Sequence, residues 1–239
     1  MAVQARHADP GSVSGGVAAP RRRRWLAALG AVLLAAGCAG TPPPDWTLDA
    51  KAAIDAAVRA DLQGLSRVPA QAHQRARAAL ARSGRLDLAA RAELLRCAAR
   101  VASLEIGPCP PFDALASDAT AADRAYARYL VGAATADDVA RLPAHHRAVA
   151  GAGRGADAAV LEGIDDPLAR LVGAAVLLQT ERAGPDVVAL AVRTSSEQGW
   201  RRPLLAWLHV QLRLAQQAGA LDEVARLQRR IDFVASVPK

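Results

Sequence analysis

Histidines and paired carboxylates are the side chains of this sequence that could carry acid–base or metal chemistry. His145 and His146 are adjacent, so on a helix their side chains would point about 100° apart and would chelate a metal poorly. The Asp-Asp pairs at 137–138 and 165–166 precede expected helices, where a carboxylate caps the first-turn amides. We therefore expect both histidines at a solvated helix start and both acidic pairs as caps. We expect His209, which lies between apolar neighbours, to be partly buried in the core or in a groove.

Motifs of known catalytic chemistry are missing from the sequence. It contains no glycine-rich phosphate loop, no nucleophile elbow and no zinc-ligand spacing. We predict no catalytic residue, no metal site and no cofactor, and hence a non-enzymatic protein.

Cys38 is the thiol with the clearest chemical context. Four arginines, Arg21–Arg24, precede an apolar run at 25–34 and then small residues. This order is typical of a secretory signal, and the run is shorter than the roughly 20 residues that span a bilayer. The sequence LAAGC at 34–38 resembles the lipobox of bacterial lipoproteins, with Ala35 where that family usually has a larger aliphatic residue. The resemblance implies cleavage between Gly37 and Cys38 and acylation of the Cys38 thiol.

The lipobox resemblance also implies a domain organisation and a location. Residues 1–37 would be the signal peptide, 38–45 a proline-rich tether and 46–239 the folded domain. Three prolines in the tether cannot continue a helix, which disfavours a buried helix that ends in a free thiol. Ala39, rather than aspartate, after the cysteine implies sorting to the outer membrane, with the domain facing the periplasm. The residues at 22–26 also resemble a twin-arginine signal, so the Sec and twin-arginine routes both stay open.

The positive charge of the chain gives little support to nucleic-acid binding. The formal net charge is +7, and loss of residues 1–37, which hold five arginines and one aspartate, lowers it to +3. Aromatic residues make up 3% of the chain, whereas a nucleic-acid interface would need a basic stripe and stacking aromatics. We predict no nucleic-acid partner.

The composition predicts an all-α fold. Alanine and leucine, the best helix formers, dominate the apolar 52% of the chain, and runs of β-branched residues are scarce. Asp45 is expected to cap the first helix, and Asp166 followed by proline predicts an N-cap. Apolar spacing, glycines and prolines place helices at about 46–64, 69–83, 86–104, 121–131, 136–142, 144–151, 156–163, 167–182, 186–197, 203–218 and 221–234.

A repeated pattern suggests antiparallel helical hairpins. SGRLDLAARAELL at 83–95 and AGALDEVARLQRR at 218–230 share glycine, Leu-Asp and Ala-Arg at the same offsets, and looser copies occur at 134–142 and 182–190. The small residue would end one helix and the aspartate would lie at the start of the next. The pattern resembles that of TPR-like α-solenoids, with Trp207, Val210 and Leu227 in motif positions but Gln211 where the motif has glycine. The alternative is an irregular helical bundle.

Cys97 and Cys109 would be the remaining thiols after acylation of Cys38, and export would place them in an oxidising compartment. If the helix ends near Leu104, the following residues are long enough to bring Cys109 back to Cys97. We predict a disulfide. The alternatives are two buried free thiols or a metal pair that lacks further ligands.

The stretch QGWRRPLLAWLHVQLRL at 198–214 gathers two tryptophans and two arginines in a chain poor in aromatics. Trp200 precedes a helix at a position where it could pack back onto Leu204 or Leu205. Alternatively, Trp200, Arg201, Arg202 and Trp207 could bind a partner at the rim of a groove, because Trp and Arg are enriched in binding hot spots.

Two classes of function remain open. The first is a lipid-anchored interaction or scaffold module, whose hairpins bind an envelope protein and whose acylated Cys38 inserts into the membrane. The second is an envelope hydrolase or small-molecule-binding protein. A ligand-sized pocket lined by histidine and carboxylate side chains would favour the second class.

Overall fold

The computed structural model describes residues 44–65 and 68–236, and in them the chain forms twelve α-helices and no β-strand. The predicted all-α fold is confirmed. The helices are α2 (Asp45–Gln63), α3 (Val68–Ala81), α4 (Leu86–Ala102), α5 (Pro110–Asp113), α6 (Ala121–Leu130), α7 (Ala136–Arg141), α8 (Ala144–Gly151), α9 (Ala159–Glu162), α10 (Pro167–Gln179), α11 (Pro185–Glu197), α12 (Arg201–Gln217) and α13 (Leu221–Ala235).

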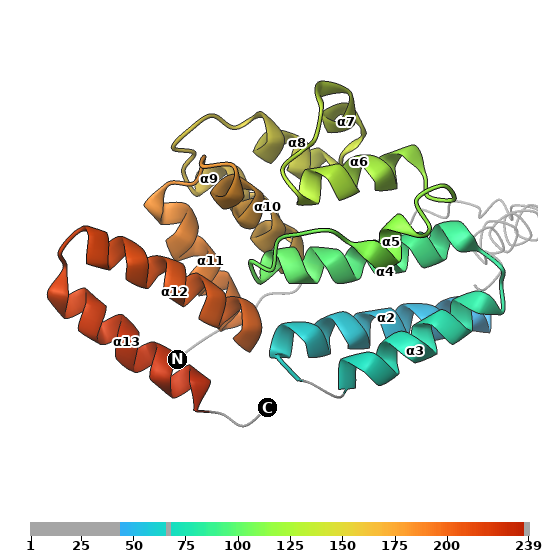
Figure 1. The fold of residues 1–239 in the computed structure, drawn as a ribbon, viewed down its shortest axis with the longest axis horizontal. Helices are drawn as coiled ribbons and strands as arrows, with labels where there is room; N and C mark the ends of the chain where they lie inside the picture. Colours follow the sequence, from blue (N-terminus) through green and yellow to red (C-terminus); the bar gives the residue numbers. More distant parts are fainter. Residues whose placement is uncertain (1–43, 66–67, 237–239) are drawn as a thin grey trace, which may run out of the picture. The chain divides into compact units, whose positions relative to one another are not determined.

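Helices α4 and α10 lie at the centre of this compact unit, which begins at Pro44 (Figure 1). The α2–α3 hairpin packs on one side of α4, and α6 packs on another. Helices α10 to α13 pack in succession, each on the one before it. The succession agrees with the predicted hairpins, but the short helices α7–α9 interrupt any regular repeat.

The core is built mainly from small aliphatic side chains, which lets the helices approach closely. Alanines are numerous among the buried residues, and Trp207 and Tyr129 are the largest fully buried side chains. In α10, a Cβ added at Gly173 would lie 2.7 Å from Leu161 and 3.3 Å from Val149. Gly173 therefore allows α8 and α9 to pack tightly against α10.

The predicted helix boundaries hold at most ends. Gly84 and Gly219 have φ values of +63° and +67° and lie just before α4 and α13, as the repeated pattern predicted. Asp166 caps α10 by accepting the amide of Ala169 at 2.7 Å. The prediction for Asp45 is wrong, because it is the first residue of α2 and Pro44 is the N-cap.

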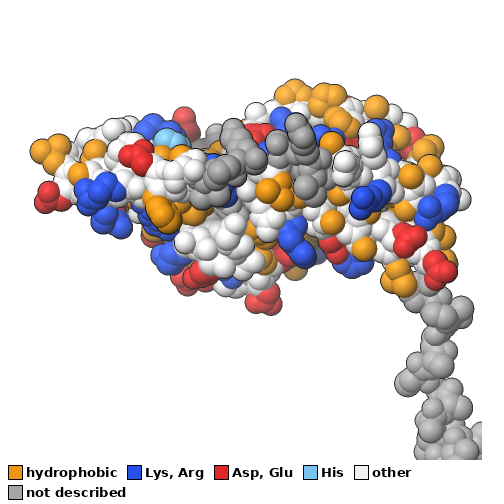
Figure 2. Space-filling model, turned by 90° about the horizontal axis from the view of Figure 1, so that it is seen from below, with side chains coloured by type: hydrophobic (Ala, Val, Ile, Leu, Met, Phe, Trp, Pro, Cys, Tyr) orange, Lys and Arg blue, Asp and Glu red, His pale blue; other side chains and the backbone are white. Residues whose placement is uncertain are grey.

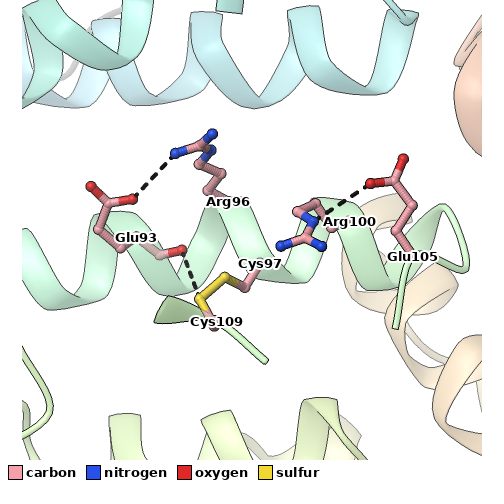
Figure 3. The surroundings of a disulfide bond; sticks show 6 residues. All are labelled: Glu93, Arg96, Cys97, Arg100, Glu105 and Cys109. Carbon is pink, nitrogen blue, oxygen red and sulfur yellow. Dashed lines mark hydrogen bonds and ion pairs between the residues drawn. A yellow bond between two sulfur atoms is a disulfide. The ribbon is translucent and has the colours of Figure 1, made fainter. Parts of the chain in front are cut away.

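Helix α4 ends in a tight reversal that sets up the disulfide. Leu104 has φ +60°, and the amides of Leu104 and Glu105 donate to Val101 O and Arg100 O at 2.8 and 2.9 Å, a Schellman motif. The chain then returns along α4 to Cys109, whose Cα lies 6.1 Å from that of Cys97 (Figure 3). The predicted disulfide between these cysteines is confirmed. The sequence missed the single turn α5, which follows Cys109 and contains prolines in its first positions.

The face in Figure 2 shows basic and acidic side chains interspersed, with separate groups of hydrophobic side chains between them. Several arginines are engaged in ion pairs, such as Arg82 with Asp49 and Arg85 with Asp87. None of the described helices combines the length and the apolar character that crossing a membrane would require.

Candidate functional site

A pocket of about 550 Å³ lies between α4, α6, the α7–α8 segment and the start of α10, and we name it the α4–α8 pocket. Its walls are mostly apolar, with Leu94, Leu95 and Ala98 from α4 and Leu168 from α10. Its volume falls in the range of small-molecule sites. The polar groups on its lining are Arg91, Asp123, Tyr126, Arg141, His145, His146 and Asp166.

Three helices begin at this pocket. The first turns of α6, α8 and α10 contribute Asp123, His146 and Ala169 to its lining. Thr120 caps α6 and Asp166 caps α10, whereas Pro143, the N-cap residue of α8, gives no side-chain cap. Because the first amides of a helix have no partner within it, these starts bring hydrogen-bond donors to one place.

The start of α6 is fixed to α4 by an ion pair at the pocket. The guanidinium of Arg91 donates to both carboxylate oxygens of Asp123, at 3.1 and 3.3 Å. The same carboxylate accepts the hydroxyl of Thr120 at 2.6 Å, within the capping box of α6. Burial raises the pKa of Asp123, but the hydrogen bonds from Arg91 and Thr120 outweigh it and hold the pKa below its usual value. Asp123 is therefore ionised, and the guanidinium of Arg91 balances its negative charge.

The same arrangement recurs one helix later. Asp138 forms a capping box with Thr135 at the start of α7 and accepts two hydrogen bonds from Arg128 of α6, one of them at 2.7 Å. The Arg128 guanidinium and the Thr135 amide hold the pKa of Asp138 well below its usual range. The predicted capping role is thus confirmed for Asp138 and for Asp166.

His146 lies in the wall of the pocket and is 1% exposed. Its Nδ1 lies 3.1 Å from the hydroxyl oxygen of Tyr129, and the tautomer decides which of the two groups donates. The His146 ring lies 4.9 Å from the Tyr129 ring and 5.4 Å from the Tyr126 ring, measured between centroids. Burial, with a smaller contribution from His145, lowers the pKa of His146 to about 3. The imidazole is therefore neutral near pH 7 and is a weak base.

Tyr126 and His146 keep unpaired polar atoms at the pocket. Among the described residues, the Tyr126 hydroxyl has no hydrogen-bond partner, and neither has Nε2 of His146. Burial, followed by the charge of Asp166, raises the pKa of Tyr126, so its hydroxyl stays protonated. A neutral hydroxyl and a neutral imidazole can each donate or accept a hydrogen bond. These atoms can orient a bound molecule without supplying charge.

The predictions for two histidines are wrong. His146 is buried rather than solvated, because it lies on the same face of α8 as the buried Val149, three residues later. That spacing, visible in the sequence, is the signal that could have found it. His209 is exposed rather than partly buried, because it points away from the face of α12 that buries Trp207 and Leu208. His145 is exposed at the start of α8, as predicted.

The structure gives internal partners to all four side chains that were predicted as a possible binding rim. Trp207 is fully buried, and its Nε1 donates to Ala102 O at 3.0 Å. Arg201 donates to Val234 O and Ala235 O at the end of α13. Arg202 lies 3.8 Å from Asp61 and 3.9 Å from Glu105. Trp200 is partly buried and packs against the main core.

The predicted cleavage and lipidation residues, Gly37 and Cys38, lie outside the described residues. In residues 44–65 and 68–236, no three His, Cys, Asp or Glu side chains are grouped closely enough to hold a metal ion. Comparison with known proteins finds no matching family model, curated protein or solved structure.

Proposed function

We propose that this protein is a lipid-anchored protein of the bacterial envelope whose helical domain binds a small molecule in the α4–α8 pocket without chemically converting it. The observation that carries the proposal is the pocket itself. Its apolar walls are interrupted by two unpaired neutral polar groups, on Tyr126 and His146. Apolar walls with a few convergent polar groups are typical of small-molecule sites.

The character of His146 supports binding rather than catalysis. A general base works best when its pKa lies near the working pH. His146 has a pKa of about 3. The two carboxylates on the lining, Asp123 and Asp166, are engaged in ion pairing and capping. Each is therefore committed to holding a helix start in position.

Binding is tested with an apolar probe and a variant that fills the mouth of the pocket. Ala122 lies on the lining and is exposed, so Ala122→Phe should occupy the pocket at little cost to folding. Ala148→Phe, at an exposed position of α8 outside the lining, is the matched control. We expect 4-phenylbutanol to bind the parent protein and the control, measured by isothermal titration calorimetry, and not Ala122→Phe. Equal binding to all three proteins, or to none, would contradict the proposal.

The proposed anchor rests on the arginines at 21–24, the short apolar run and the residues at 34–38. One acyl chain binds a membrane only marginally, whereas the several chains of a lipoprotein cysteine anchor it stably. Cys38→Ser in the native host should abolish signal processing and move the protein out of the detergent phase. A variant that is still processed and still partitions with membranes would refute lipidation.

A second candidate function is the interaction module that the hairpin pattern predicts. Two large apolar side chains at opposite ends of α13, Leu221 and Phe233, are 79% and 76% exposed and give positions at which a protein partner can be sought. A photo-crosslinking residue at Phe233 should then give a defined adduct in intact cells, and one at exposed Arg213 of α12 should not. Identical adduct patterns at the two positions would count against a specific partner.

A further inference from the structure

The charges on the lining of the α4–α8 pocket fall into two groups, and each acidic side chain already accepts hydrogen bonds from the protein. Asp123 is held by both nitrogen donors of Arg91 and by the capping box of Thr120. Asp166 accepts the amide of Ala169 at the start of α10, where the helix dipole offsets a negative charge. Asp123 therefore has a cationic partner before any ligand enters, whereas Asp166 has only the amides of its own helix start.

The positively charged and hydrogen-bond-donating groups on the lining have fewer partners within the protein than the carboxylates have. Arg141 donates to the backbone carbonyl of Asp137 at 2.6 Å, and among the described residues no carboxylate lies within ion-pair distance of its guanidinium. Helix α8, eight residues long, begins after Pro143 without a side-chain cap. The amides of Ala144 and His145 in its first turn therefore lack the side-chain acceptor that α6 and α10 have.

A buried polar side chain gives an independent indication of a ligand. His146 is 99% buried, its Nδ1 is engaged by Tyr129, and Tyr129 is not part of the lining. The opposite edge of the ring, with Nε2 unpaired, therefore forms the wall of the pocket beside the first turn of α8. Among the described residues, the buried side-chain atoms without a partner are Thr194 Oγ1 and Gln211 Oε1, so Nε2 of His146 instead borders the open space of the pocket and is free to bond an occupant.

We propose that the α4–α8 pocket binds a small molecule that carries a carboxylate on an apolar or aromatic body. The carboxylate lies against Arg141 and the first turn of α8, where a guanidinium and helix amides provide charge-assisted hydrogen bonds. The body packs between Leu94, Leu168 and the ring of Tyr126. This ligand class rests on the proposed function, namely that the pocket binds small molecules.

Three probes with one body and different head groups test the ligand class. The full-length oxidised chain carrying Cys38→Ser, which cannot be acylated, is titrated calorimetrically with 4-phenylbutyrate, 4-phenylbutanol and 4-phenylbutylamine. We expect the carboxylate to bind about 5-fold more tightly than the alcohol, the scale of a partly exposed ion pair, and the amine to bind most weakly.

Two lining variants and a control locate the head group. Arg141→Gln should reduce the affinity for 4-phenylbutyrate about 5-fold and leave that for 4-phenylbutanol unchanged. Asp166→Asn should strengthen binding of the carboxylate about 2-fold or more, because asparagine keeps the cap and removes the negative charge. Arg147→Gln is the control, since Arg147 also donates to a backbone carbonyl but is not on the lining.

The outcomes separate the ligand class from the proposed function. Equal affinities for the carboxylate and the alcohol, or an equal effect of Arg141→Gln on all three probes, would overturn the carboxylate class and leave the pocket as a neutral binding site. Failure of all three probes to bind would overturn both proposals. A loss at Arg147→Gln as large as that at Arg141→Gln would also refute the assigned position of the head group.

Discussion

The α4–α8 pocket and the start of the α12–α13 hairpin contain the same kinds of side chain, aromatic rings and arginines, but use them differently. In the hairpin region, Trp207 and Arg201 complete hydrogen bonds to backbone carbonyls of other elements. At the pocket, the Tyr126 hydroxyl and one nitrogen of His146 have no partner among the described residues. Residue type alone therefore does not mark a site in this protein. Unused hydrogen-bonding capacity next to a cavity is the better criterion.

Helix α4 joins the two regions. Its middle lines the pocket through Leu94 and Ala98, and its last residue, Ala102, accepts the hydrogen bond from Trp207. Changes in the hairpin region should accordingly appear as losses of stability, and changes at the pocket as losses of binding. Four experiments test this contrast.

The largest loss of stability is expected for Trp207→Ala, because the indole is fully buried and bonded to α4. We expect the free energy of unfolding to fall by about 3–5 kcal/mol in chemical denaturation. Trp207→Phe, which keeps an aromatic ring but removes the indole donor and part of the buried volume, is the control and should cost less. A loss below about 1 kcal/mol for Trp207→Ala would remove the contrast between the two regions.

The disulfide should contribute about 3 kcal/mol, since it closes a loop of about 13 residues in the unfolded chain. We expect the double variant Cys97→Ala with Cys109→Ala to lower the melting temperature, and reductant to have the same effect on the parent protein only. Because the bond fixes the end of α4, both regions should lose protection together in hydrogen exchange. Loss of protection confined to α5 would show that α4 does not depend on the bond.

Acid should destabilise the fold through His146. Its pKa is lowered by burial from 6.5 to about 3, so between these values the unfolded chain binds a proton that the folded protein does not. The free energy of unfolding should therefore fall as the pH falls through this window, by about 1.4 kcal/mol per pH unit. The free energy of unfolding, measured by urea titration at a series of pH values, should fall more steeply with falling pH in the parent protein than in His146→Gln. Parallel pH profiles would mean that His146 is not buried in neutral form.

The smallest changes are expected for the two tyrosines, which form a matched pair on α6. Tyr129→Phe leaves Nδ1 of His146 unpaired and should cost about 1–2 kcal/mol of stability. Tyr126→Phe removes a hydroxyl without a partner in the described residues, so stability should change by less than about 0.5 kcal/mol. Binding of 4-phenylbutyrate should weaken only for Tyr126→Phe when the folded proteins are compared. Weaker binding for Tyr129→Phe, with a loss of stability for Tyr126→Phe, would contradict the assignment of Tyr126, and not Tyr129, to the wall of the pocket.

The helical architecture could be predicted from the sequence because its signals are local. Glycines with positive φ, such as Gly84 and Gly219, and the N-cap Asp166 mark helix ends wherever they occur. Helix α5 was not predicted because proline disfavours the interior of a helix, although it is favoured in a first turn such as that of α5.

The site was much less predictable, because it depends on packing between distant helices. The sequence showed Asp123 and Arg91 as ordinary charged residues, and only the packing of α6 on α4 brings them together. His146 was wrongly predicted to be solvated, although its spacing from Val149 indicated a buried helix face. The possible binding rim at 200–207 was predicted from its tryptophans and arginines alone. Residue type carries no information on which partners each side chain has in the fold.

The short separation of Cys97 and Cys109 bears on the order in which an exported chain would mature. The two cysteines are only 12 residues apart, so they would leave a translocation channel almost together, well before α10. A periplasmic oxidase would then meet a single possible pairing, provided that Cys38 is already acylated. Bond formation would need no isomerase and could fix the end of α4 before the helices that pack on it arrive. Loss of acylation would add a third thiol and, with it, the first opportunity for mispairing.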